Sequence, residues 1–169
     1  MQRAFETVVF SHGKESGPWG AKITAMAAVA REQGGAVASI DYRGIDDPQQ
    51  RVEKLIAAGR AFTAPLVLVG SSMGGHVSAA AARALQARGL FLLAPAFYLP
   101  ALDASTPRAP QCPAAIVHGW RDEVVPVENS IRWAREERAA LHILDADHRL
   151  QDRISEIGQL LRAFLQSLN

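Results

Sequence analysis

Three short segments of the sequence carry side chains that could together perform nucleophilic catalysis. Residues 70–74 read Gly-Ser-Ser-Met-Gly, and two later segments contain Asp122 and His148. A serine hydroxyl is a poor nucleophile until a base takes its proton, and a histidine oriented by a carboxylate is a common base. The chain order Ser, Asp, His is one that such triads follow. We therefore predict that Ser72 attacks an acyl carbon, that His148 takes and returns the proton, and that Asp122 holds the imidazole.

Ser72 needs an exposed position, and the segments around it indicate how it obtains one. The apolar run Leu66–Gly70 precedes it and the Ala-rich stretch Met73–Ala87 follows it, which is typical of a strand, a sharp turn and a helix. The flanking glycines let the two backbones approach closely. Acyl transfer also needs backbone N–H donors for the developing oxyanion. We expect these donors at Met73 and at Lys14, in the loop after the first strand.

Other residues compete for the base and acid roles. Glu123 neighbours Asp122 but would point differently from the same loop. Asp145 and Asp147 lie too close to His148 along the chain to orient it easily, and Asp147 is a good candidate for capping the last helix. The remaining histidines are better explained by strand-end turns, strand packing or the helix after the nucleophile; they are His12, His76, His118 and His142.

The sequence indicates neither a metal site nor a cofactor. Asp145, Asp147 and His148 are metal-ligand types, but no second cluster would supply the remaining ligands. Cys112 cannot form an internal disulfide, and nothing in its surroundings marks it as activated. Several aromatic residues in the expected strand-end loops could line a substrate pocket or could equally pack in the core or at the rim. They are Trp19, Phe97, Tyr98 and Trp120.

Short apolar runs alternate with longer helical stretches along the whole chain. Continuously apolar runs suit a parallel sheet that is covered on both faces, and the alternation predicts an α/β fold. The expected strands are Thr7–Ser11, Ala36–Ile40, Leu66–Gly70, Leu90–Leu93, Ala114–His118 and Leu141–Leu144. The expected helices are Ala21–Glu32, Pro48–Gly59, Met73–Ala87, Val127–Glu137 and Leu150–Leu168. Asp122 and His148 then follow strands, at the carboxyl edge where open parallel sheets bind ligands.

Composition limits the class of protein. The 169 residues suggest one domain, residues 1–169, and 18 Lys and Arg against 17 Asp and Glu give a net charge of +1. Such a balance argues against a nucleic-acid partner. The longest apolar stretch, Leu90–Leu102, is interrupted by Pro95 and Pro100 and falls short of the ~20 residues of a membrane-spanning helix. Because the N-terminus also lacks the apolar centre of a signal peptide, we expect a cytoplasmic protein.

Four motifs together resemble the α/β-hydrolase superfamily, and in particular its small lidless bacterial esterases. They are Ser-His-Gly at 11–13, Gly-Ser-Ser-Met-Gly-Gly at 70–75, His-Gly-Trp-Arg-Asp-Glu-Val-Val-Pro at 118–126 and Asp-Ala-Asp-His at 145–148. The resemblance implies a three-layer α/β/α sandwich with strand order 2-1-3-4-5-6. It also implies the triad predicted above and the same oxyanion donors. The family's two N-terminal antiparallel strands are absent from the sequence, and Ala94–Pro113 has no room for its usual cap.

The same resemblance implies a serine esterase that forms an acyl–enzyme on small carboxylic esters without a cofactor. A thioesterase, an amidase or a peptidase could use the same triad, and a non-catalytic binding module could share the fold. If His148 is the base, activity should rise with pH through about 6 to 7. The second and last strands would be sheet edges, so we expect a monomer or a homodimer.

Overall fold

The computed structural model describes residues 4–102, 104–109 and 111–169. Within these residues, six strands form one sheet in the order β2-β1-β3-β4-β5-β6, and every neighbouring pair is parallel. This is the strand order that the sequence predicted. The strands are β1 (Thr7–Ser11), β2 (Ala36–Ile40), β3 (Leu66–Ser71), β4 (Gly89–Leu93), β5 (Ala114–Gly119) and β6 (Ala140–Leu144).

The central strands are apolar along their length because both faces of the sheet are covered. Successive side chains of a strand point to opposite faces. In β1, Val8 and Phe10 therefore face one core while Val9 faces the other. In β3, Val67 faces the first of these cores and Leu68 faces the second. All five residues are fully buried or nearly so. The continuous apolar run is thus the sequence signature of two cores that share one sheet.

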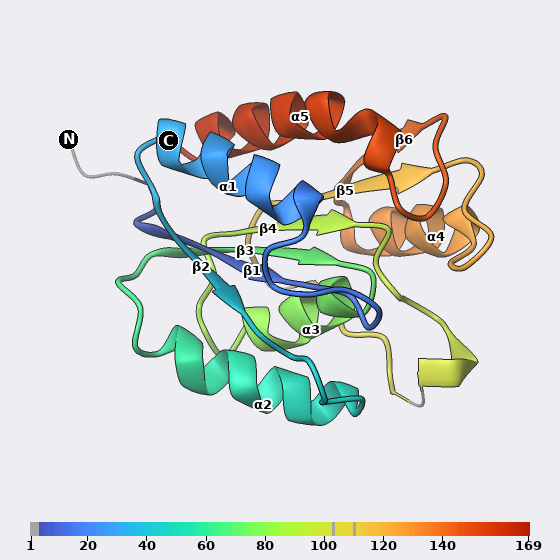
Figure 1. Cartoon of the computed structure of the whole chain (residues 1–169), viewed down its shortest axis with the longest axis horizontal. Helices are drawn as coiled ribbons and strands as arrows, with labels where there is room; N and C mark the ends of the chain where they lie inside the picture. Colours follow the sequence, from blue (N-terminus) through green and yellow to red (C-terminus); the bar gives the residue numbers. More distant parts are fainter. Residues whose placement is uncertain (1–3, 103, 110) are drawn as a thin grey trace.

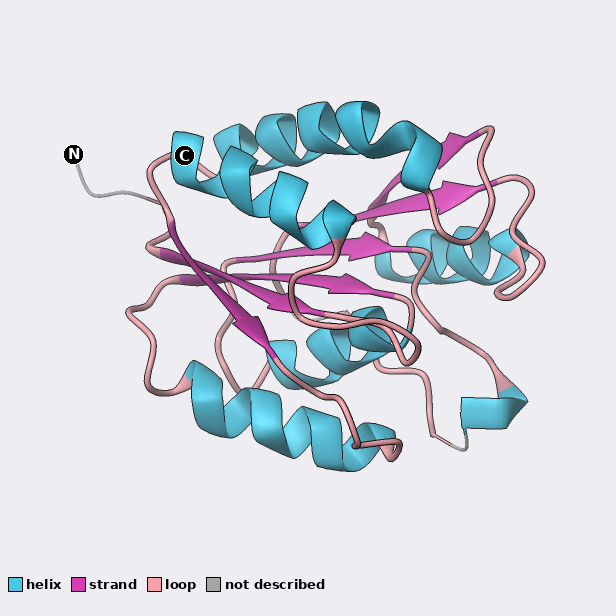
Figure 2. Cartoon of the chain, in the orientation of Figure 1, coloured by secondary structure: helices cyan, strands magenta, loops and turns pink. Residues whose placement is uncertain are grey.

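Helices cover the two faces in two groups, as Figure 1 shows. The helices α1 (Ala21–Glu32) and α5 (Ile154–Ser167) lie on one face, above the sheet in this view. The helices α2 (Pro48–Gly59), α3 (Met73–Ala82) and α4 (Val127–Glu137) cover the other. All the strand arrows point the same way, so the loops that follow them gather at one edge of the sheet (Figure 2). This arrangement is the predicted three-layer sandwich.

Two helix boundaries differ from the expected ones. The helix after Ser72 ends at Ala82 rather than Ala87, because the chain turns through Gln86 with φ 48° and the N–H of Ala87 returns to the Ala82 carbonyl. A left-handed residue followed by such a bond is a common helix end. The last helix begins at Ile154 rather than Leu150, which is also left-handed, with φ 56°.

The long connection between β4 and β5 carries little regular structure. Of its described residues, only Pro100–Leu102 form a helix, a single 3₁₀ turn. Pro110 of this proline-rich connection lies outside the described residues. The described residues of this connection therefore form no cap domain over the carboxyl edge of the sheet. Among the described residues, no helix is both long and apolar enough to cross a membrane.

Candidate active site

Ser72 lies on a tight turn between β3 and α3. Its backbone has φ 55° and ψ −119°, a strained conformation for a residue with a side chain. Two glycines make the turn possible. A Cβ on Gly70 would lie 2.2 Å from the Gly74 carbonyl oxygen, and a Cβ on Gly74 would lie 2.0 Å from the Ser11 carbonyl oxygen. The helix therefore starts in direct backbone contact with β1 and β3, and the strained residue projects its hydroxyl from the edge of the sheet.

Ser72, His148 and Asp122, which we expected to act together, are joined by hydrogen bonds. The Nε2 atom of His148 is 3.0 Å from the Ser72 hydroxyl, and its Nδ1 atom is 2.7 Å from the Asp122 carboxylate. Since a carboxylate only accepts, Nδ1 carries the ring proton and Nε2 has a lone pair for the serine proton. The residues are 76 and 26 positions apart in sequence, so the fold alone assembles this geometry.

The Asp122 carboxylate is held in place by four donors. One oxygen accepts from His148 and from His118, and the other accepts from the N–H groups of Val124 and Val125, both at 2.8 Å. The side chain has no exposed surface, whereas His148 is 20% exposed. Burial alone would raise the pKa of Asp122, but these hydrogen bonds outweigh it and hold that pKa well below its usual range.

His118 contacts the Asp122 carboxylate, which the sequence did not reveal. Its Nε2 atom lies 2.9 Å from Asp122 and 3.0 Å from the Val125 carbonyl, so this nitrogen must donate. Its Nδ1 atom is 2.7 Å from the Ser130 hydroxyl of α4. The fully buried imidazole thus ties the end of β5 to α4 and to the carboxylate. The sequence offers one local indication of this contact, which is that His118 lies four residues before Asp122.

The loop after β1 is anchored from beneath by a buried arginine. Arg51 of α2 donates from Nη1 to the carbonyls of His12 and Gly13, both at 3.3 Å, and from Nε to the Ile45 carbonyl at 2.7 Å. The side chain is 1% exposed. His12 adds a second donor: its Nδ1 atom is 2.7 Å from the Gly13 carbonyl, while its Nε2 atom accepts the N–H of Tyr42. Burial and the nearby guanidinium lower the pKa of His12, in keeping with a neutral ring.

This anchoring sets the direction of the Lys14 N–H group. In a trans peptide the C=O and N–H groups point in opposite directions. Because Arg51 and His12 hold the Gly13 carbonyl inward, the N–H of Lys14 points away from α2. A Cβ on Gly13 would lie 3.4 Å from the Ser72 Cβ, so this loop runs beside the nucleophile. Within the described residues, neither the Lys14 N–H nor the Met73 N–H has a hydrogen-bond acceptor, which leaves both available to a ligand.

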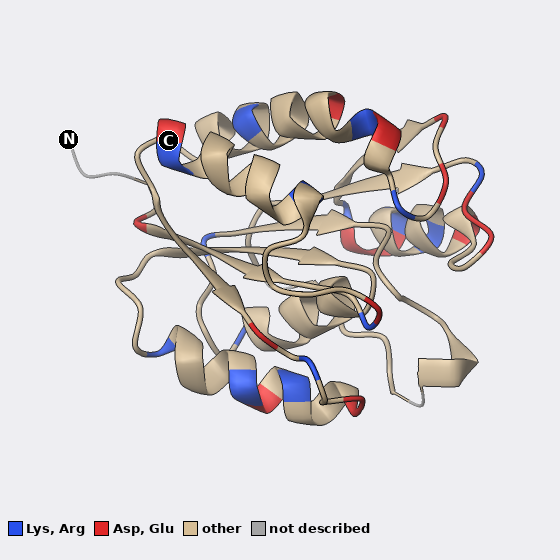
Figure 3. Cartoon of the chain, viewed as in Figure 1, with Lys and Arg blue, Asp and Glu red and all other residues tan. Residues whose placement is uncertain are grey.

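A cleft of about 810 Å³ opens over Ser72. Its walls come from the β1–α1 loop, the start of α1, and the loops after β5 and β6 (Figure 2). Its charged lining residues are Lys14, Glu15, Lys22, Arg121, Glu123, Asp147 and Arg149. The loops at this edge carry both signs of charge (Figure 3). The cleft therefore presents charges of both signs to a ligand.

The aromatic residues expected as pocket candidates lie elsewhere, since none of the four is among the described residues that line this cleft. Phe97 is completely buried and stacks on Trp133, with 4.8 Å between ring centroids. Tyr98 donates its hydroxyl to Glu136 of α4. Trp19 and Trp120 are 49% and 59% exposed. Phe97 gives the clearest correction: we considered it as a residue of the substrate pocket, but its side chain packs in the core.

The rival acids have other partners. Asp145 pairs with Arg121 at 2.6 Å, and Asp147 accepts the N–H groups of Arg149 and Leu150 as a cap of the turn that precedes α5. Glu123 is exposed at the cleft rim. Within the described part of the chain, no group of three or more His, Cys, Asp or Glu side chains is arranged to hold a metal ion.

Comparisons with known proteins agree with this fold. The model of a family described as "Alpha/beta hydrolase family" matches residues 8–168. A solved structure from Xanthomonas campestris pv. campestris, titled as a hydrolase of the alpha/beta superfamily, has a TM-score of 0.90 and 32% identity over 96% of this chain and 99% of that one. No curated protein matches the chain.

Two more distant structures share the fold. An α/β serine hydrolase without a lid, also from Xanthomonas campestris, has a TM-score of 0.75 and 21% identity, and the match covers 95% of this chain and 81% of that one. Est1E from Butyrivibrio proteoclasticus, solved with ferulic acid bound, has a TM-score of 0.84 and 16% identity over 96% and 89% of the two chains. At these identities the similarity concerns architecture alone.

Proposed function

Because the chain belongs to the alpha/beta hydrolase family, we propose that it is a serine hydrolase that cleaves small carboxylic esters with Ser72 as the nucleophile. The observation that carries the proposal is the unbroken hydrogen-bonded series from the Ser72 hydroxyl through His148 to Asp122. In the first step, the Ser72 oxygen bonds to the ester carbonyl carbon and the hydroxyl proton passes to Nε2 of His148. The carbonyl oxygen becomes an oxyanion, for which the N–H groups of Met73 and Lys14 are the proposed donors.

The tetrahedral intermediate then collapses. The bond to the alcohol oxygen breaks, that oxygen takes the proton from His148, and the acyl group remains bound to Ser72. In the second half, water attacks the acyl carbon while His148 takes its proton. The Ser72 ester bond then breaks, the Ser72 oxygen takes the proton from His148, and the carboxylic acid is released. Asp122 stays ionised throughout and stabilises the positive imidazolium, a role supported by its four hydrogen bonds and its low pKa.

The cleft supports small esters as the substrate class. Its lining includes seven charged side chains, and the described residues form no cap domain over its mouth. Long acyl chains gain affinity from burial, at about 0.8 kcal/mol for each buried methylene, but the part of a chain that extends beyond this open cleft stays in solvent. We therefore expect catalytic efficiency to stop rising before the acyl chain reaches octanoyl length.

Hydrolysis of p-nitrophenyl acetate tests the proposal. The wild type should release p-nitrophenol, and Ser72→Ala should lower kcat by about 10³-fold or more while the circular dichroism spectrum is kept. Ser71→Ala is the matched control, because it removes the neighbouring hydroxyl, and it should retain turnover within about tenfold. Turnover by Ser72→Ala equal to that of the wild type would refute the role of Ser72. Matched thioester and anilide substrates decide between an esterase, a thioesterase and an amidase.

A further inference from the structure

One charged side chain of the cleft takes no part in the proposed mechanism. Lys22 lies in the first turn of α1 and lines the cleft together with Ser71 and Ser72. Its ammonium group donates to the Ser71 hydroxyl at 3.2 Å. Ser71 directly precedes the nucleophile, so the lysine charge lies in the same part of the cleft as the reacting oxygen. Its side chain is partly buried in the wall of the cleft, unlike the exposed Lys14 at the rim.

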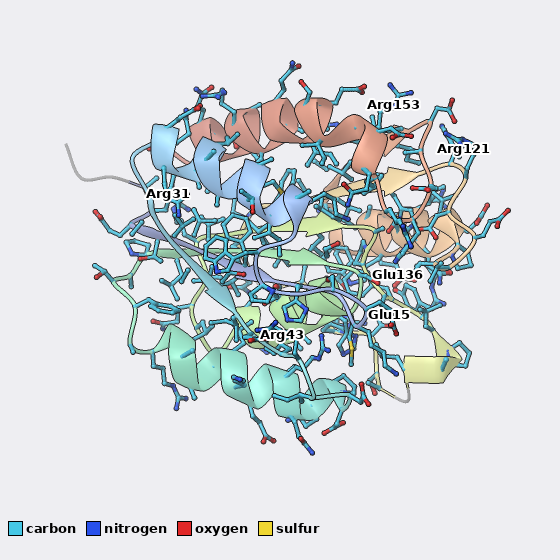
Figure 4. The ribbon with its side chains drawn as sticks, viewed as in Figure 1. Glu15, Arg31, Arg43, Arg121, Glu136 and Arg153 are labelled. Carbon is cyan, nitrogen blue, oxygen red and sulfur yellow. The ribbon has the colours of Figure 1, made fainter. Side chains whose placement is uncertain are left out.

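The ammonium group of Lys22 has more donors than the protein uses. It offers three N–H bonds, and the Ser71 hydroxyl is the one acceptor found for it among the described residues. No carboxylate of the described residues lies within 4.0 Å of it. Two other cleft cations have carboxylate partners: Arg121, labelled in Figure 4, pairs with Asp145 at 2.6 Å, and Lys14 lies 3.9 Å from Asp46. Arg149 is exposed to solvent. Lys22 is thus a partly buried cation of the cleft wall whose ammonium group contacts no carboxylate of the described residues.

Lys22 is nevertheless positively charged in neutral solution. Burial lowers its pKa to about 8, while the carboxylates of Asp147 and Asp122 favour the charged form. With such a pKa, roughly nine-tenths of the molecules carry the charge at pH 7. A partly buried charge is costly unless an opposite charge and hydrogen bonds accompany it. A ligand that brings an anion to this position would therefore gain both a hydrogen bond and a charge interaction.

We propose that Lys22 selects esters that carry a carboxylate a short chain away from the scissile carbonyl, as in a monoester of a small dicarboxylic acid. The proposal rests on the ester hydrolysis by Ser72 proposed above, and it names the class of ester that this reaction would cleave. A carboxylate fits because it can accept two hydrogen bonds from an ammonium that has two donors to spare. The short spacing follows from the position of Lys22 beside Ser71. Glu15, Glu123 and Asp147 are exposed, so solvent screens their repulsion of such an anion. The four donors around Asp122 offset the negative charge of that carboxylate.

A matched pair of esters tests the proposal: p-nitrophenyl butyrate, which is neutral, and mono-p-nitrophenyl succinate, which carries a carboxylate. The measured quantity is the ratio of kcat/KM for the anionic ester to kcat/KM for the neutral one at pH 7. Lys22→Met should lower this ratio by about tenfold to a hundredfold, the effect of one charged hydrogen bond in a partly buried site. Lys22→Arg should restore most of it, and Lys22→Glu should lower it further.

The control is Lys54→Met, because Lys54 of α2 donates to the Asp41 carbonyl and is not among the residues that line the cleft. It should leave the ratio unchanged. A ratio that stays at the wild-type value in Lys22→Met would overturn the proposal. A parallel loss with both esters would overturn it too, because that pattern indicates a structural role through Ser71.

A measurement without turnover separates this proposal from the mechanism. Biosynthetic labelling with ¹³C-lysine gives each lysine of the chain an ε-carbon resonance without changing the ammonium group, and Lys22→Met identifies that of Lys22. Monomethyl succinate at millimolar concentration should shift the Lys22 resonance in the Ser72→Ala variant, and methyl butyrate should not. Absence of a shift would contradict the role of Lys22 even if hydrolysis is observed. Absence of hydrolysis together with a shift would contradict Ser72 chemistry instead.

Discussion

At the scale of single residues, the environment of Asp122 explains how a buried carboxylate stays ionised. Two histidine nitrogens and two backbone N–H groups surround it, so every oxygen lone pair that points into the protein has a donor. The depressed pKa means that the group is charged in the folded state over the whole neutral range. His148 therefore keeps a fixed acceptor on Nδ1, and its Nε2 atom is always the one that faces Ser72.

The first prediction concerns this carboxylate. Asp122→Asn should lower kcat by about 10³-fold to 10⁴-fold, because an amide can offer its N–H to Nδ1 and stabilise the wrong imidazole tautomer. Steady-state hydrolysis of p-nitrophenyl acetate measures it. Glu123→Gln, one residue further along the chain, should lower kcat by less than about tenfold. The reverse order of the two effects would mean that Glu123 is the acid, the alternative that the sequence left open.

A second prediction at this scale concerns His76 of α3. Burial lowers its pKa to about 4, and its Nδ1 atom has no hydrogen-bond partner among the described residues. Between pH 6.5 and about 4 the unfolded chain takes up a proton that the folded protein excludes, so stability falls as the pH is lowered. The loss should reach about 3 kcal/mol by pH 4.

Urea unfolding of the wild type and of His76→Leu at pH 7 and pH 4 measures this loss. The substitution should remove most of the extra destabilisation at pH 4, whereas the half-buried His142→Leu should leave it in place. An equal pH dependence in the wild type and His76→Leu would show that another group is responsible.

The sequence predicted the three central residues and missed those that support them. Ser72, Asp122 and His148 stand in local patterns with a fixed chain order. Arg51 and Lys22 have no such pattern, because their partners, Gly13 and Ser71, lie 38 and 49 positions away. The directions of loop side chains are equally hidden in sequence. For that reason the aromatic pocket residues could not be told from core residues, and the structure places Phe97 in the core.

At the scale of elements, strands were easier to predict than helix ends. Every strand starts and ends within one residue of its apolar run, because burial on both faces leaves a continuous signal. The helix ends at Ala82 and Ile154 depend on left-handed backbone at Gln86 and Leu150. Glycine or asparagine usually occupies such positions, and neither residue does so here, so no signal marked these ends.

The element-scale prediction concerns the way α2 supports the loop after β1. Arg51→Met should lower kcat by about tenfold to a hundredfold with a smaller change in KM, because the Gly13–Lys14 peptide loses the donors that fix its direction. Arg51→Lys should recover part of this loss. A phenylboronic acid, whose adduct places a hydroxyl where the oxyanion forms, should bind more weakly in proportion to the fall in kcat/KM.

The matched control is Arg43→Met, since Arg43 is exposed and pairs with Asp41 two residues away. It should change kcat and boronate affinity by less than about twofold. A fall in thermal stability of Arg51→Met without any change in kcat would assign the arginine a purely structural role.

At the scale of the whole molecule, one sheet is shared by both hydrophobic cores. The strands contribute alternate residues to the two cores. Loss of packing in one core would therefore disturb the strands that also form the other core. The edge strands β2 and β6 are less buried than the four central strands. A monomer or a homodimer paired through such an edge remains the prediction for the oligomeric state.

The shared sheet predicts that residues 1–169 unfold as one domain. Thermal unfolding followed by far-ultraviolet circular dichroism and by tryptophan fluorescence should give a single transition with the same midpoint. The fluorescence reports on the core because Trp133 of α4 is 1% exposed. Two resolved midpoints would contradict the single-domain prediction.

The most direct measurement of the central claim is the intact mass of the folded protein after reaction with a fluorophosphonate, which bonds covalently to an activated serine. The account predicts one adduct per chain, located on Ser72 by peptide mapping, and a much slower reaction in the Asp122→Asn variant. It also predicts that Ser72→Ala gains no mass. A folded wild-type protein that stays unmodified, or an adduct on any other residue, would contradict it.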